Sequence, residues 1–238
     1  MANDLKTGTV LLIPIPIAED ALSTLSGETT VHTATITHYF VENIRTARRF
    51  LRSLHPKLVI DSILFSEIDK HVGPDTDLFR KWLSEGHTIG IMSEAGCPGI
   101  ADPGAELVSI AQHAGAKVTP LVGPNSLILA LMSSGLNGQS FCFTGYLPIK
   151  DPTRSKRIKE LEAISLKENQ TQLFIETPYR NDHLLADLLK HCNDRTRICI
   201  AQNITAADAF IKTKTVAEWH KNIPVLGKSP AVFLLLGR

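Results

Sequence analysis

The segment 93–104, SEAGCPGIADPG, contains the residues of this chain that are best suited to bind a ligand. The apolar run Thr88–Met92 before it predicts a strand, and apolar residues with helical spacing follow it. Glycines let a backbone approach a ligand closely, and ligands of open α/β sheets bind outside the carboxyl ends of the strands. We expect Asp102 to cap the following helix and Pro103 to occupy its first position. A helix-capping turn without a ligand explains the same segment equally well.

The order of the expected elements indicates an α/β protein of two domains, residues 1–122 and 123–238, with a ligand cleft between them. In the first domain strands and helices alternate, which is typical of a mostly parallel sheet. Its strands are expected at 10–13, 58–61, 88–92 and 117–122, and its helices at 40–54 and 77–85. The second domain should open with a helix at 126–134 and contain a mixed, largely antiparallel sheet. The strands of that sheet are expected at 141–143, 172–175, 198–201, 209–211 and 232–236.

The composition is that of an ordinary globular protein, with 43% hydrophobic residues, 21% charged residues and a formal net charge of +1 over 238 residues. A charge so close to zero gives no general attraction to nucleic acid or anionic membranes, so a local patch must hold any such partner. The four cysteines form no C-x-x-C pair and residues 1–6 lack a signal-peptide pattern, which predicts a cytoplasmic protein. We expect no membrane span and no metal site, because no apolar run approaches ~20 residues and the histidines lack ligand spacing.

Two basic clusters are candidates for contact with a phosphate backbone. Arginines at i, i+3, i+4 and i+7 form a stripe on the expected helix at 40–54, namely Arg45, Arg48, Arg49 and Arg52. The segment 150–159 carries five basic residues in ten. A solvated helix flank and a solvated helix start explain the same two patterns. Neither G-x-G-x-x-G nor G-x-x-x-x-G-K-[ST] occurs, so a nicotinamide or nucleoside triphosphate site has no support.

Several segments, in order along nearly the whole chain, resemble motifs of the tetrapyrrole (corrin/porphyrin) methylase superfamily, in particular its branch of small-subunit ribosomal RNA 2′-O-ribose methyltransferases. The segment 93–104 is similar to the family's Ser-Asp-Ala-Gly-x-Pro-x-Ile-x-Asp-Pro-Gly, with Glu94 in place of the first aspartate. The segment 122–126 resembles a Pro-Gly-Pro-Ser/Cys motif. Further on, 145–148 resembles Gly-Phe-Leu-Pro, and 175–180 resembles Tyr-Glu-Ser/Ala-Pro-His-Arg.

The resemblance implies a two-domain methyltransferase that uses S-adenosylmethionine and works as a homodimer, with RNA as the expected partner. The residues implied to bind the donor are Pro14, Ser93, Glu94, Ala95, Gly96, Pro124, Ser126, Ala201 and Asn203. The candidates for binding the substrate are Arg45, Arg48, Arg49, Lys150, Arg154 and Arg180. Transfer of a sulfonium methyl group depends on positioning and on exclusion of water, so neither a metal nor a covalent nucleophile is required.

Three residues are candidates for a direct part in the reaction: Glu94, Glu176 and Tyr179. Glu94 would favour the sulfonium charge or bond the ribose or amino group of the donor, and capping of backbone N–H groups is an equal alternative. Glu176 and Tyr179 would orient the acceptor. A buried salt link between Glu176 and Arg180 is an equally good explanation for that glutamate.

The chain departs from the motifs of the RNA branch mainly at polar residues that would meet the acceptor. Pro16 replaces a glycine and Asn43 replaces an aspartate. Three charged residues of the branch are replaced by Gln202, Asn203 and Ala206. Two alternatives therefore stay open: the acceptor is a tetrapyrrole precursor or another small molecule, or the chain is a noncatalytic relative that binds S-adenosylmethionine or RNA.

Overall fold

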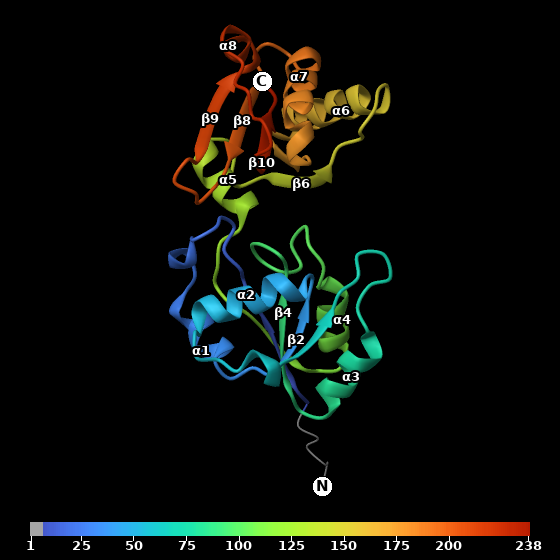
Figure 1. Cartoon of the computed structure of the whole chain (residues 1–238). Coiled ribbons are helices and arrows are strands. Elements are labelled where there is room, and N and C mark those ends of the chain that lie inside the picture. Colours follow the sequence, from blue (N-terminus) through green and yellow to red (C-terminus); the bar gives the residue numbers. More distant parts are fainter. Residues whose placement is uncertain (1–6) are drawn as a thin grey trace. The chain divides into compact units, whose positions relative to one another are not determined.

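In the computed structural model, which describes residues 7–238, the chain divides into two compact units (Figure 1). The first unit ends at Asn125 and the second runs from Ser126 to Arg238, so the boundary expected after residue 122 lies slightly earlier in the chain. The signal-peptide pattern concerns residues 1–6, which lie outside the described residues.

The first unit is a five-stranded sheet of order β3-β2-β4-β1-β5 in which every described strand pair is parallel. This confirms the parallel sheet expected from the alternation of strands and helices. Its strands are β1 (Thr9–Leu12), β2 (His38–Val41), β3 (Leu64–Glu67), β4 (Thr88–Met92) and β5 (Lys117–Pro120). Its helices are α1 (Gly27–Thr33), α2 (Ile44–Leu54), α3 (Thr76–Ser84) and α4 (Ala105–His113).

Helices cover both faces of this sheet because successive strand residues point to opposite sides. Tyr39 faces the core that includes Phe50 and other residues of α2. Its neighbour Phe40 faces the opposite core, which includes Phe79 of α3 and Leu107 of α4. The carboxyl ends of all five strands are thereby left to the loops, which is where ligands of such sheets bind.

Two of the helices and strands expected in the first unit are wrong. The helix expected at 40–54 begins only at Ile44, because Phe40 belongs to β2. Asn43 caps this helix, and its side chain accepts a hydrogen bond from the N–H of Thr46 at 3.0 Å. The strand expected at 58–61 is replaced by a short 3-10 helix (Ile60–Ser62), and β3 follows it. Short apolar runs are compatible with both strand and helix, so their pattern alone does not decide between them.

The second unit is a five-stranded sheet of order β6-β7-β10-β8-β9. Among the described strand pairs of this second sheet, β6 with β7 is parallel and the others are antiparallel, which confirms the mixed, largely antiparallel sheet. The strands are β6 (Phe141–Tyr146), β7 (Thr171–Ile175), β8 (Arg197–Gln202), β9 (Phe210–Thr215) and β10 (Ala231–Leu236). The helices are α5 (Ser126–Ser134), α6 (Thr153–Glu168), α7 (Asn181–His191) and α8 (Val216–Lys221). Residues of α6, α7 and α8 share one core with the sheet, and α5 contributes to the other.

Candidate functional site

Three loops meet at the carboxyl edge of the first unit's sheet. Gly96, in the loop after β4, exchanges two backbone hydrogen bonds of 2.9 Å with Ile15, in the loop after β1. A Cβ atom on Gly96 would lie 3.6 Å from the carbonyl oxygen of Pro124, in the loop after β5. Gly123 packs so closely on Pro14 that a Cβ atom there would come within 2.2 Å of the proline's Cβ. We call this place the loop junction.

The loop after β4 owes its shape to glycines. Gly96, Gly99 and Gly104 have φ values of +72°, +80° and +127°, a region that side chains disfavour and glycine adopts freely. The expected caps of the next helix are wrong, because α4 begins at Ala105 and Gly104 precedes it without a side-chain cap. Gly104, with its positive φ, lies between Pro103 and the first residue of α4, so Asp102 and Pro103 precede the cap position of the helix.

A charged cluster lies beside the loop junction. The buried carboxylate of Glu42, directly after β2, accepts a hydrogen bond from the backbone N–H of Glu94 at 3.0 Å. Its other oxygen lies 3.1 Å from Lys70 Nζ, and the Glu94 carboxylate lies 3.6 Å from the same nitrogen. The hydrogen bond and the charge of Glu42 raise the pKa of Lys70. The carboxylate of Glu94 therefore faces an ammonium group.

Asp102 is the third carboxylate of this cluster. Burial, followed by the charge of Glu42, raises the pKa of Asp102 from 3.8 to about 6, although Lys70 and a hydrogen bond to Ser93 act in the opposite direction. A carboxyl group with such a pKa beside the loop after β4 is a functional-site candidate. We call Glu42, Lys70, Glu94 and Asp102 the charged cluster.

Sequence reasoning did not single out Glu42 or Lys70 as site residues. Had His38–Val41 been predicted as a strand and not partly as the start of a helix, Glu42 would have been expected at the same sheet edge as the loop after β4. Lys70 carries no comparable signal, because its partners are far away in the sequence.

In the second unit, Glu176 follows β7 and its carboxylate is fully buried. One oxygen accepts hydrogen bonds from Arg180 Nη2 at 2.7 Å, from Arg180 Nε at 3.0 Å and from the N–H of Thr177 at 2.8 Å. The other oxygen lies 3.4 Å from Arg154 Nη2. Burial alone would raise the pKa of Glu176, but the bonds from Arg180 and Thr177 and the charge of Arg154 leave the pKa below its ordinary value. The salt link between Glu176 and Arg180 is thereby confirmed.

Arg154 is buried, and its position corrects the expectation that it contacts phosphates. Its guanidinium pairs with Glu176 and, through Nε at 3.1 Å, with Asp187 of α7. Two carboxylates therefore neutralise a side chain that the sequence places in a surface cluster. Arg180 is partly exposed and lies 5.2 Å from the ring centre of Tyr179, which is itself exposed.

The other candidates of the second unit occupy several elements. Ala201 is buried near the end of β8. Asn203 follows that strand with φ +51°, and its Nδ2 donates to Asp208 at 2.8 Å. Ser126 is the first residue of α5, whereas Lys150 is exposed just before α6.

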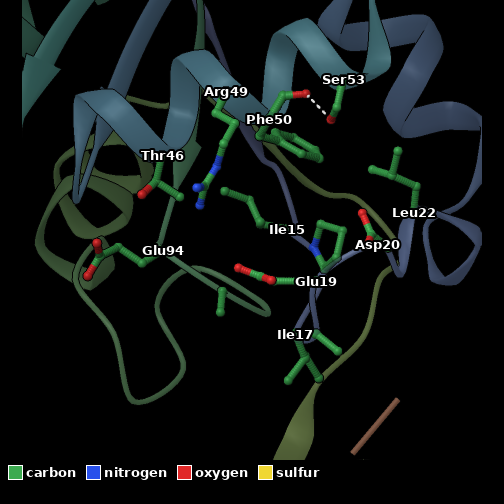
Figure 2. Close-up of a pocket in the computed structure, with 13 residues that line it drawn as sticks. Ile15, Ile17, Glu19, Asp20, Leu22, Thr46, Arg49, Phe50, Ser53 and Glu94 are labelled. Atoms are coloured by element: carbon green, nitrogen blue, oxygen red, sulfur yellow. Dashed lines mark hydrogen bonds between the residues drawn. The ribbon is translucent and has the colours of Figure 1, made fainter. Parts of the chain in front are cut away.

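The arginine stripe lies on α2, in the first unit. Its members line a shallow depression on the helix together with Ile44. Arg48 pairs with Asp61 at 2.5 Å, and both side chains are well exposed. Arg49 also borders a separate pocket of about 380 Å³, into which its side chain points (Figure 2).

Two further features concern metals and membranes. Residues 7–238 contain no group of three or more His, Cys, Asp or Glu side chains that could hold a metal ion. In the same described part of the chain, no helix is both long enough and apolar enough to cross a membrane. All four cysteines are free thiols.

Comparison with known proteins connects this geometry to a family. The model of the tetrapyrrole (corrin/porphyrin) methylases matches residues 9–219. A ribosomal RNA small subunit methyltransferase I from Escherichia coli is 28% identical, over 98% of this chain and 79% of that protein. Proteins of the same name are 30% identical in Synechocystis, over 83% of this chain and 67% of the relative, and 37% identical in Vibrio cholerae, over 57% and 46%. The match to the Vibrio protein thus spans about half of that relative's length.

Solved structures share the fold. Diphthine synthase superimposes with a TM-score of 0.67 at 12% identity, covering 97% of this chain and 90% of that one. The methyltransferase CobJ superimposes with a TM-score of 0.64 at 17% identity, covering 97% and 95%. At such identities the likeness concerns the fold alone.

Proposed function

Since the chain belongs to the tetrapyrrole (corrin/porphyrin) methylases, we propose that it is an S-adenosylmethionine-dependent methyltransferase that modifies small-subunit ribosomal RNA at a ribose 2′-hydroxyl. The family supports methyl transfer, and the relatives named ribosomal RNA small subunit methyltransferase I support the substrate class. The structural observation that carries the proposal is the loop junction with its charged cluster. At this place backbone groups that glycines leave accessible lie beside carboxylates, at the edge of the sheet where ligands of such sheets bind.

The residues at the junction fit this donor. The sulfonium and amino groups of S-adenosylmethionine are cationic, and the charged cluster sets three carboxylates against the single ammonium group of Lys70. Glycines with positive φ leave backbone groups open to a ligand. In the first unit, the proposed donor contacts are Pro14, Ser93, Glu94, Ala95, Gly96 and Pro124. Ser126, Ala201 and Asn203 stay predicted contacts, and the cleft between the domains also stays a prediction.

The chain's own part in the reaction is to hold the reactants in place. When bound, the donor supplies a methyl group to an acceptor oxygen, the sulfur keeps the electron pair of the broken bond, and the hydroxyl proton passes to a carboxylate or to water. Glu42 fixes the donor loop through the N–H of Glu94, and the paired hydrogen bonds of Ile15 and Gly96 fix it from the other side. Such positioning can supply ~7–11 kcal/mol of a barrier without a metal or a covalent intermediate.

The arginine stripe on α2 supports RNA as the substrate, because exposed arginines at helical spacing can follow a phosphate backbone. The proposed contacts there are Arg45, Arg48 and Arg49, with Lys150 and Arg180 in the second unit. The resemblance further supports a homodimer, which sedimentation of the purified protein tests. The four cysteines without a C-x-x-C pair support a cytoplasmic location.

Calorimetric titration with S-adenosylmethionine, followed by methyl transfer to small ribosomal subunits that lack the modification, tests the proposal. We expect donor binding and a new methyl group at a ribose 2′-oxygen. Transfer to a tetrapyrrole precursor and not to RNA would favour the small-molecule alternative. Donor binding without any transfer would favour a noncatalytic relative.

A further inference from the structure

We propose that the pocket beside Arg49 binds the acceptor nucleotide after it has left the RNA stack, an inference that rests on the proposed function. The pocket lies wholly in the first unit, and we call it the α2 pocket. Its walls are the loop after β1 with Leu22, the part of α2 from Thr46 to Ser53, and the start of the loop after β4. Its volume of about 380 Å³ falls in the usual range for small-molecule sites, ~300–1,000 Å³.

The α2 pocket adjoins the proposed donor site. Glu94 and Ala95, two of the proposed donor contacts, line it. Ile15 lines it as well, and the hydrogen bonds of Ile15 to Gly96 join the two places directly. An occupant of the pocket would therefore lie next to the donor loop, where an acceptor has to be.

The chemistry of the walls fits a nucleotide. Figure 2 shows the Arg49 guanidinium reaching from α2 toward Ile15 and Glu19, with Glu94 on the same side of the pocket. An anionic phosphate matches Arg49, and ribose hydroxyls and base amino groups can donate hydrogen bonds to the carboxylates. Apolar side chains complete the walls and match the faces of a base: Ile15, Leu22 and Phe50.

Simpler ligands fit these walls less well. A bare phosphate would face the carboxylates of Glu19, Asp20 and Glu94 with one arginine to oppose them. A purely apolar ligand would desolvate these charges without replacing their hydrogen bonds. A nucleotide carries the anion at one end and the hydrogen-bond donors at the other, so it satisfies both kinds of group.

Arg49 also connects the pocket to the surface where RNA is proposed to bind. It lines the shallow depression of the arginine stripe as well as the α2 pocket. A phosphate chain that follows the stripe would reach the pocket at Arg49, and the nucleotide attached there could turn inward. Enzymes that act on a base of a nucleic acid take the target nucleotide out of its stack in this way, and the same movement would bring the ribose of that nucleotide to the donor loop.

Nucleotide binding to four variants tests the inference, with millimolar nucleoside 5′-monophosphates as probes and S-adenosylhomocysteine present. Ala18→Trp fills the pocket, because Ala18 lines it, and Arg49→Ala removes its cation. The matched controls are Ala114→Trp, at an exposed alanine after α4, and Arg80→Ala, at an exposed arginine of α3. We expect Arg49→Ala to lose about tenfold or more in nucleotide affinity, as for a lost charge-assisted contact, and Ala18→Trp to lose at least as much because the indole occupies the pocket, while the controls bind like the parent.

Donor titration and thermal unfolding of each variant check that its fold and its donor site are intact. If Ala18→Trp does not fold, Thr46→Phe is used in its place to fill the pocket. Parental nucleotide affinity in the pocket variants, or no binding to the parent, would overturn the inference. Methyl transfer to small-subunit RNA separates it from the proposed function. Transfer at the parental rate by Ala18→Trp would overturn the pocket alone. Nucleotide binding lost only in the pocket variants, with no transfer by the parent, would support the pocket and count against the proposed function.

Discussion

Replacing Glu176 by glutamine tests whether this residue holds the loop after β7. Glutamine keeps the size of the side chain but removes the charge that faces Arg180 and Arg154. Only 5% of the Arg154 side chain and 23% of the Arg180 side chain are exposed, so water replaces the lost charge poorly. Removal of one partner from a buried pair costs about 3–5 kcal/mol. We expect the free energy of unfolding of the second unit to fall by an amount near the lower end of this range, because Asp187 still faces Arg154.

The two tryptophans provide the assay, because Trp82 lies in the first unit and Trp219 in the second. In a Trp82→Phe background, urea unfolding followed by fluorescence reports on the second unit. Glu160→Gln is the matched control, since Glu160 pairs with Arg157 at 3.4 Å but 45% of its side chain is exposed. An exposed pair contributes ~0–1 kcal/mol. If Glu176→Gln costs no more than this control, the buried pair does not hold the loop and the reasoning is refuted.

The pH dependence gives an independent check of the same claim. The pKa of Glu176 is lower in the folded protein than its ordinary 4.5, so the ionised form is favoured by folding. The stabilisation is therefore complete above pH 4.5 and is lost as the pH falls through the folded value. The parent should lose stability more steeply over this range than Glu176→Gln.

Three further changes test other parts of the structure. Gly96→Ala should weaken donor binding in calorimetry, because φ is +72° and the left-handed region costs a side chain ~1–2 kcal/mol; Gly138→Ala, with open space and no positive φ, is its control. Burial, followed by the charge of His87, lowers the pKa of His38, so the neutral form is favoured by folding. The contribution of His38 to the free energy of unfolding should therefore be fully present above pH 6.5 and be lost as the pH falls below that value. In urea unfolding, His38→Gln should show a flatter dependence of stability on pH. Neutralising Arg45, Arg48 and Arg49 together should make RNA binding less dependent on salt, because each lost phosphate contact lowers the slope of log affinity against log salt concentration by ~0.7–0.9. The affinity for the donor should not change.

Each of these has a clear contrary result. Parental donor affinity in Gly96→Ala would remove the glycine loop from the donor site. An unchanged pH profile in His38→Gln would mean that another group titrates. An unchanged salt slope would leave the arginine stripe as a solvated helix flank.

The elements that could be predicted from the sequence have local signals that admit one interpretation. Thr88–Met92 is an apolar run that ends at a glycine-rich turn, and it is β4. The helix at Ser126–Ser134 ends before Gly135, whose φ of +66° explains the stop. The predicted start of α2 was wrong because Phe40 also fits the periodicity of that helix. In the structure the side chain of Phe40 packs on the face of the sheet opposite to α2.

The site shows the same division between local and distant signals. The glycine loop could be predicted, since its conformation depends on its own residues. The burial of Arg154 could not be predicted, because its partners Glu176 and Asp187 are distant in the sequence and lie in the loop after β7 and in α7. The departure at Asn43 has a local explanation: its side chain caps α2, and asparagine and aspartate serve equally well there.

A map of 2′-O-methyl groups on small-subunit ribosomal RNA tests the central claim most directly. The map is measured with the gene present, with it deleted, and after the deleted strain's small subunits are treated with purified protein and S-adenosylmethionine. We predict that a ribose methyl group is lost on deletion and restored by the parent protein, and restored less by Gly96→Ala. Identical maps with and without the gene, and no transfer by the purified protein, would contradict the account.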